Sequence, residues 1–120
     1  MRLLVKIHED CALDVPDDPR ILVERRYLEP EELATWYRGL DVFLCLSRGE
    51  GWGLHALQAM ACGVPVVAPR FSGLAEFHSE TTGWVVGHRL TTMADPQFPD
   101  PGCWAEVEHP VELLRDLAEN

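Results

Sequence analysis

Apolar runs and amphipathic stretches alternate along this chain of 120 residues. Short continuous apolar runs predict strands covered on both faces, as in a parallel sheet. Apolar positions that recur every three or four residues predict helices, each with one buried face. We expect strands at residues 3–7, 21–27, 41–46, 65–68 and 84–86, and helices at 30–40, 53–61 and from 110 onward. Strands that alternate with helices favour an α/β fold with a doubly wound parallel sheet.

Individual residues refine this pattern. Pro30 stands where the first turn of a helix tolerates proline. Trp36 and Tyr37 fit the apolar face of the helix at 30–40 and need no ligand to explain them. Residues 89–103 contain three prolines and are expected to form an irregular excursion.

The segment between the third and fourth predicted strands carries the most chemistry. Residues 47–54 read Ser-Arg-Gly-Glu-Gly-Trp-Gly-Leu, and residues 58–67 read Gln-Ala-Met-Ala-Cys-Gly-Val-Pro-Val-Val. The pattern predicts a βαβ unit with a glycine-rich turn at the carboxyl end of its first strand, where open parallel sheets bind ligands. The glycines let backbone N–H groups approach a ligand, and the unpaired N–H groups at the helix start attract an anion such as a diphosphate.

These residues resemble the donor-binding motif of the retaining glycosyltransferases of family 4, which have the GT-B fold. The family motif is Glu-x7-Glu, and here Glu50 occupies its first position and Gln58 its second. Ser-Gly-Leu-Ala-Glu at 72–76 and Thr-Gly-Trp-Val-Val at 82–86 resemble the segments that follow the motif. The resemblance implies a Rossmann-like sheet that forms the carboxy-terminal, donor-binding half of a GT-B fold, incomplete in this chain.

The resemblance also implies a reaction and a set of site residues. The donor would be a nucleoside-diphosphate sugar, whose hexose is transferred to an acceptor hydroxyl with retention and without a metal ion or other cofactor. Glu50 is the implied catalytic residue, in contact with the hexose, and Gln58 is implied to face the ribose hydroxyls. Because an amide carries no charge, its bonds to hydroxyls are expected to be weaker than those of a carboxylate. The implied donor-binding residues are Gly51, Trp52, Gly53, Leu54 and Gln58.

Two departures from the family pattern leave a second interpretation open. Gln58 replaces a glutamate, and nothing in the chain matches the Arg–Lys pair that binds the diphosphate in the family. The alternative is a degenerate, non-catalytic module that binds a nucleotide sugar or serves as an interaction domain. Without the resemblance, Glu50 reads as a solvated loop carboxylate and Trp52 as a packing residue beside the motif.

The resemblance covers only part of a carboxy-terminal half-domain. We therefore expect residues 1–120 to form a single partial nucleotide-sugar-binding domain that is inactive alone. The amino-terminal domain, which supplies acceptor contacts in the family, would be its missing partner. The edges of such a truncated sheet are expected to favour self-association.

The composition of the chain limits which binding partners and which cellular compartment we expect for this protein. A net charge of −10 repels phosphate backbones and anionic lipid heads, which argues against nucleic acid and membrane partners. No apolar run approaches the roughly 18 residues of a membrane span, and the first apolar run is too short for a signal peptide. The four cysteines form no Cys-x-x-Cys pair, and no histidine cluster has metal-ligand spacing. We therefore expect a cytoplasmic protein with free thiols and no metal ion.

Overall fold

The computed structural model describes residues 1–92 and 103–119. In chain order the elements are β1 (Leu3–Lys6), β2 (Ile21–Glu24), α1 (Pro30–Arg38), β3 (Phe43–Leu44), α2 (Leu54–Ala61), β4 (Val66–Pro69), the 3-10 turn η1 (Ser72–Glu76), β5 (Gly83–Val86), β6 (His88–Thr92), β7 (Cys103–Val107) and α3 (Val111–Glu119). Most of these elements lie where the sequence predicts a strand or a helix, so the alternating α/β pattern is confirmed.

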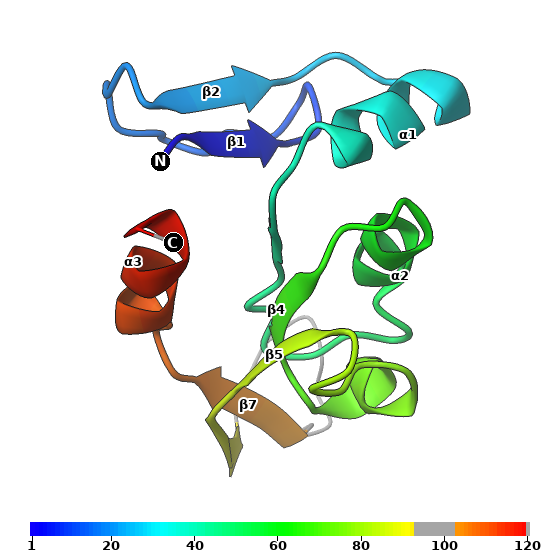
Figure 1. The fold of residues 1–120 in the computed structure, drawn as a ribbon, viewed down its shortest axis with the longest axis vertical. Coiled ribbons are helices and arrows are strands. Elements are labelled where there is room, and N and C mark those ends of the chain that lie inside the picture. Colours follow the sequence, from blue (N-terminus) through cyan, green and yellow to red (C-terminus); the bar gives the residue numbers. More distant parts are fainter. Residues whose placement is uncertain (93–102, 120) are drawn as a thin grey trace.

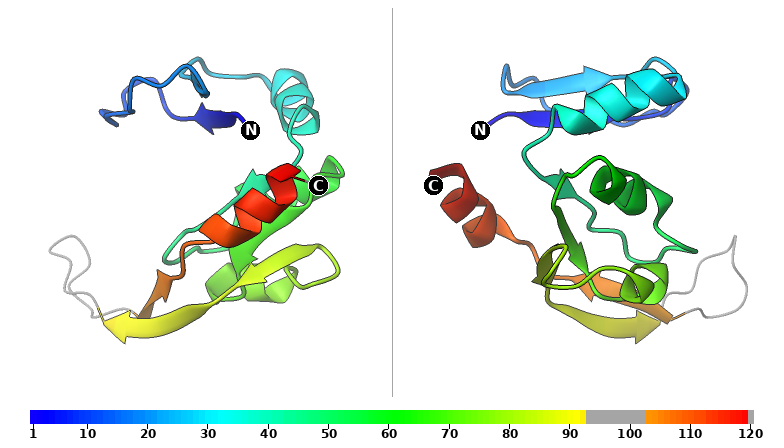
Figure 2. Two further views of the ribbon diagram at one scale, coloured as in Figure 1. Left: turned by 60° about the vertical axis from the view of Figure 1, so that its left-hand side comes forward. Right: turned by 45° about the vertical axis from the view of Figure 1, so that its right-hand side comes forward.

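The described strands form three small sheets. β1 and β2 pair in parallel, and β3, β4 and β5 form a second parallel sheet with β4 in its centre. β6 and β7 form an antiparallel pair. The β1–β2 pair and α1 lie at one end of the molecule, and α2 and α3 lie on opposite sides of β4 (Figure 1), as the right-hand view of Figure 2 also shows.

Local sequence explains where α1 begins and what it buries. The backbone N–H of Glu29 donates to the Glu32 carboxylate at 3.1 Å, as one half of a capping box. Pro30 occupies the first turn, as predicted from the sequence. Tyr37 is buried, and its ring packs edge-on against Phe43 of β3 with the ring centroids 5.6 Å apart. The helix is therefore fixed on the sheet by an aromatic contact.

The core lies between α1, α2 and the central parallel sheet. All four residues of β4 are buried, as expected of the central strand of a covered parallel sheet. Ala56 and Ala59 face the sheet from α2 with no exposed surface, and such small side chains let the helix pack closely on β4. The buried cluster consists of Tyr37, Ala56, Ala59, Val64, Val66, Ala68 and Leu74.

The predicted single doubly wound sheet needs correction. In the described residues the β1–β2 pair and the β3–β4–β5 sheet share no strand pairing. The strand predicted at 41–46 is also shorter, because regular pairing is confined to Phe43–Leu44, although the Cys45 N–H still donates to the Val67 carbonyl at 2.9 Å. An apolar run shows that residues are buried, but it does not show how many of them find a partner strand.

The irregular excursion predicted at 89–103 also needs correction at both ends. His88–Thr92 and Cys103–Val107 are antiparallel strands, and Leu90 lies opposite Ala105. The residues of β6 do not alternate regularly between half-buried and exposed positions. Such a strand has no period of two from which its sequence could be recognised. Residues 93–102, which the same prediction includes, lie outside the described residues.

Candidate functional site

The motif loop, residues 47–53, follows β3 and leads into α2. Its centre is held by η1, the turn that follows β4. The Gly73 N–H donates to the Glu50 carbonyl at 3.2 Å, and the Ser72 hydroxyl donates to the same oxygen at 2.5 Å. These two bonds fix the peptide that carries the Glu50 side chain.

The turn that holds Glu50 is closely packed and strained. Ser72 has a φ of 56°, a left-handed conformation that costs a non-glycine residue about 1 kcal/mol or more. A Cβ on Gly73 would lie 2.5 Å from the Trp52 Cα and 2.6 Å from the Gly51 carbonyl oxygen. Glycine is therefore needed at 73 so that η1 can pack directly on the backbone of the motif loop.

The opposite side of the motif loop is held by β7. The Ala105 N–H donates to the Arg48 carbonyl at 2.9 Å, and the Arg48 Nε donates to the Ala105 carbonyl at 3.3 Å. Ala105 is fully buried, and the side-chain bond from the exposed Arg48 is partly buried. The motif loop is thus clamped between η1 and the antiparallel β6–β7 pair.

The start of α2 has no side-chain cap. Gly53 precedes the helix with a φ of 80°, and no side chain caps the first turn by a hydrogen bond. A Cβ at Gly53 would lie 2.6 Å from the Leu74 Cδ2, so the position is also sterically closed to other residues. The first N–H groups of α2 consequently remain available to a negatively charged group.

Two apolar side chains flank this helix start. Trp52 is 50% exposed, and its ring lies 6.1 Å from the Phe77 ring between centroids. Leu54 is 59% exposed. Trp52 therefore packs against Phe77 and leaves half of its surface to solvent. This arrangement is compatible with a packing role and with a donor-binding role.

The Glu50 side chain is half-buried near the end of β3. Burial raises the pKa of the neighbouring Cys45 thiol, and the negative charge of Glu50 raises that pKa further. In the chain, Glu50 lies in the loop between β3 and α2, on the side of β3 where open parallel sheets bind ligands.

Gln58 is tied to α1 through Tyr37. The Tyr37 hydroxyl donates to the Gln58 Oε1 at 3.3 Å and lies 3.4 Å from the His55 Nδ1. Burial raises the pKa of Tyr37 to about 12, so the phenol keeps its proton at neutral pH. Because the amide oxygen is engaged by Tyr37, the amide NH2 is the part of Gln58 left free to donate to a ligand.

Tyr37→Phe is expected to lower the free energy of unfolding by about 1 kcal/mol, because it removes a partly buried hydrogen bond and preserves the ring packing. Urea unfolding followed by circular dichroism measures the change. Tyr27→Phe is the matched control, since Tyr27 is 74% exposed. Equal unfolding midpoints for the two variants would show that the bond to Gln58 contributes nothing.

The predicted site residues lie on one continuous stretch of the chain, from the motif loop into α2. The motif loop, the helix start and the exposed face of α2 carry Glu50, Gly51, Trp52, Gly53, Leu54 and Gln58. The roles assigned to them stay predictions. The sequence does not predict the contacts that hold these residues in place. Ser72 bonds to Glu50, Tyr37 to Gln58 and Ala105 to Arg48, and each bond depends on how distant segments pack.

No group of three or more His, Cys, Asp and Glu side chains in residues 1–92 and 103–119 is arranged to hold a metal ion. Within the same ranges, every helix is too short or too polar to cross a bilayer.

Comparison with known proteins gives consistent matches. The family model described as glycosyl transferases group 1 matches residues 8–95. A D-inositol 3-phosphate glycosyltransferase of Corynebacterium efficiens is 36% identical over 105 residues, 83% of this chain and 21% of the relative. The enzyme of the same name from Pseudarthrobacter chlorophenolicus is 48% identical over 66 residues, 53% of this chain and 16% of the relative. A lipopolysaccharide core biosynthesis mannosyltransferase of Rhizobium meliloti is 48% identical over 61 residues, 48% of this chain and 17% of the relative. The chain thus spans about a fifth or less of the length of these relatives.

Proposed function

Because the chain belongs to the group 1 glycosyltransferases, we propose that it is the donor-binding part of a retaining hexosyltransferase. The observation that supports the proposal is the motif loop, in which Glu50 lies between β3 and the uncapped start of α2. A carboxylate for sugar hydroxyls and helix amides for a diphosphate are thereby offered side by side. A nucleoside-diphosphate sugar has both groups.

In this proposal each part of the site has one task. Glu50 accepts hydrogen bonds from the hydroxyls of the hexose, and its peptide is fixed by η1. Gly51, Trp52, Gly53 and Leu54 bring backbone N–H groups and apolar surface to the donor. The free amide of Gln58 donates to a ribose oxygen, because its own oxygen is bound by Tyr37.

The proposed reaction exchanges one bond for another on the same face of the sugar. The bond from the sugar C1 to the diphosphate oxygen breaks, and a bond from C1 to the acceptor oxygen forms. The acceptor proton passes to the leaving diphosphate, so no protein nucleophile and no metal ion are needed. This chain contributes orientation and charge stabilisation. One relative carries the name of a mannosyltransferase, which supports a hexose donor.

Calorimetric titration of the chain with sugar esters of UDP, GDP and ADP tests donor binding. We expect one of the three series to bind, with an affinity unchanged by EDTA. Absence of binding for all three would contradict the proposal. A chain that binds a nucleotide sugar but transfers no sugar, even with acceptor and the remaining parts of the enzyme supplied, would favour the alternative of a non-catalytic module. The amide of Gln58 in place of the family's glutamate is the reason to consider this alternative.

A further inference from the structure

His78 follows η1, the turn that holds the peptide of Glu50. Its side chain is 1% exposed, and among the described histidines it alone is buried. It does not belong to the predicted donor site. We propose that His78 is a positioning residue, whose ring fixes η1 and thereby holds the Glu50 carboxylate in place for a sugar.

The ring of His78 joins two neighbouring strands. Its Nε2 lies 3.2 Å from the carbonyl oxygen of Ala68 in β4 and 3.2 Å from that of Trp84 in β5. Because a carbonyl oxygen can only accept, Nε2 must carry a hydrogen and donate to both. Nδ1 lies 3.2 Å from the Thr82 hydroxyl, just before β5. Both ring nitrogens therefore have partners, and the ring cannot turn without breaking these bonds.

The backbone of His78 carries this restraint into η1. Its N–H donates to the Leu74 carbonyl at 2.8 Å. Leu74 is buried, and its side chain lies against Gly53 at the start of α2, where an added Cβ would be 2.6 Å from the Leu74 Cδ2. The adjacent Gly73 N–H donates to the Glu50 carbonyl at 3.2 Å. A continuous series of contacts thus leads from the two strands through the ring to the peptide of Glu50.

The first residue of η1 needs such a restraint. Ser72 has a φ of 56°, and a residue keeps this left-handed conformation only where its surroundings enforce it. In this conformation its hydroxyl donates to the Glu50 carbonyl. If the ring of His78 leaves the strands, Ser72 can relax and release Glu50. The pairing of β4 with β5 has its own backbone bonds and should survive, so the loss stays local.

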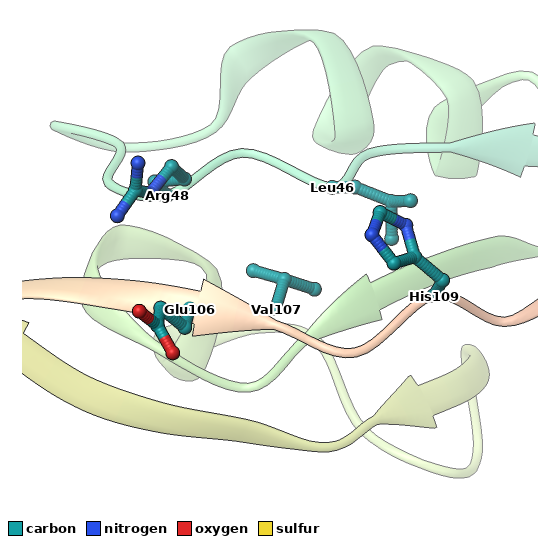
Figure 3. A pocket seen from close by; sticks show the side chains of 5 residues that line it. All are labelled: Leu46, Arg48, Glu106, Val107 and His109. Carbon is teal, nitrogen blue, oxygen red and sulfur yellow. The ribbon is translucent and has the colours of Figure 1, made fainter.

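The β7 side of the motif loop gives less support at Glu50. Arg48 is bound to Ala105, but a cleft of about 410 Å³ lies between the segment that follows β3 and the strand β7. The cleft is lined by Leu46, Arg48, Glu106, Val107 and His109 (Figure 3). The peptide of Glu50 therefore depends on η1 and, through it, on His78.

Calorimetry on two variants tests the role of Nε2, and this experiment rests on the proposed function. The amide nitrogen of glutamine reaches about as far as Nε2, and its two hydrogens suit the two carbonyls, whereas the amide of asparagine ends near Nδ1. With the UDP-, GDP- or ADP-sugar that the chain binds, His78→Asn is expected to weaken binding about tenfold. The corresponding nucleoside diphosphate should lose less than about twofold, since only the hexose contacts Glu50. His78→Gln should stay within about threefold of the unmodified chain for both ligands. His8→Asn, at an exposed position after β1, is the control and should change neither affinity.

Amide hydrogen exchange followed by NMR tests the same role without a ligand. In His78→Asn the Gly73 N–H should exchange about tenfold faster, while the Cys45 N–H, which is bonded to Val67 in the central sheet, should keep its rate. A general loss of stability would accelerate both amides equally. In the unmodified chain the Nε2–H of His78 and the N–H of Gly73 should open with one equilibrium constant, because release of the ring frees the turn.

Three results would overturn the positioning role: equal acceleration at Gly73 and Cys45, an unchanged rate at Gly73, or a His78→Gln variant that binds as weakly as His78→Asn. If His78→Asn does not fold, the unmodified chain decides, since unequal opening of the His78 ring and Gly73 hydrogens contradicts the role and equal opening supports it. If no nucleotide sugar binds, the proposed function fails, and the exchange of Gly73 still decides whether His78 fixes η1.

Discussion

Gly83→Ala is expected to lower the free energy of unfolding by about 3 kcal/mol or more. Gly83 begins β5 opposite Val66 of β4, and a Cβ there would lie 1.9 Å from the Val66 carbonyl oxygen and 2.6 Å from its nitrogen. Val66 is fully buried in the central strand, so its backbone has no free space in which to move. The added methyl group would therefore push β5 away from the sheet. Urea unfolding followed by the fluorescence of the four tryptophans should show a lower midpoint at an unchanged slope.

Gly51→Ala is the matched control for that experiment. A Cβ at Gly51 would meet no atom within 4 Å, so its unfolding midpoint should stay within about 0.5 kcal/mol of the original. If the two variants unfold at the same urea concentration, the close approach of β5 to β4 is wrong. The position of η1, which connects these strands and holds Glu50, would then be in doubt as well.

The sequence predicts the parts of this fold that depend on local pattern. The helix α1 has its proline in the first turn and a periodic apolar face, and it forms where these signals place it. The buried strand β4 reads as a continuous apolar run because both of its faces are covered. The motif loop follows from its glycines and from the resemblance to family 4. Each of these features is encoded within a dozen neighbouring residues.

The remaining features depend on partners that are distant in the chain. The β6–β7 pair joins two segments on either side of residues 93–102, and β6 carries little alternation of its own. The apolar spacing of the helix at 30–40 predicts that Tyr37 is buried, as it is, but its hydroxyl reaches Gln58 only because α1 packs on α2. The bond between Arg48 and Ala105 joins residues 57 positions apart. Such contacts are set by tertiary packing, which a single sequence does not show.

Glu50→Gln is expected to weaken the binding of a nucleotide sugar by about 10- to 100-fold, and the binding of the corresponding nucleoside diphosphate by less than about twofold. The substitution preserves the length of the side chain and removes its charge. In the proposed site the carboxylate accepts from sugar hydroxyls alone, so a ligand without the hexose should be indifferent to the change. Calorimetric titration of both ligands into the same protein measures the difference directly.

Glu80→Gln makes the same change of charge on an exposed residue between η1 and β5, and it should leave both affinities unaltered. A general electrostatic effect in this acidic chain would appear in both variants. A loss confined to Glu50→Gln but equal for the two ligands would mean that Glu50 acts on the shape of the motif loop, whose backbone η1 already holds. Only a loss that follows the hexose assigns the carboxylate to the sugar, because removing a negative charge cannot by itself weaken the nucleotide sugar more than the more highly charged nucleoside diphosphate.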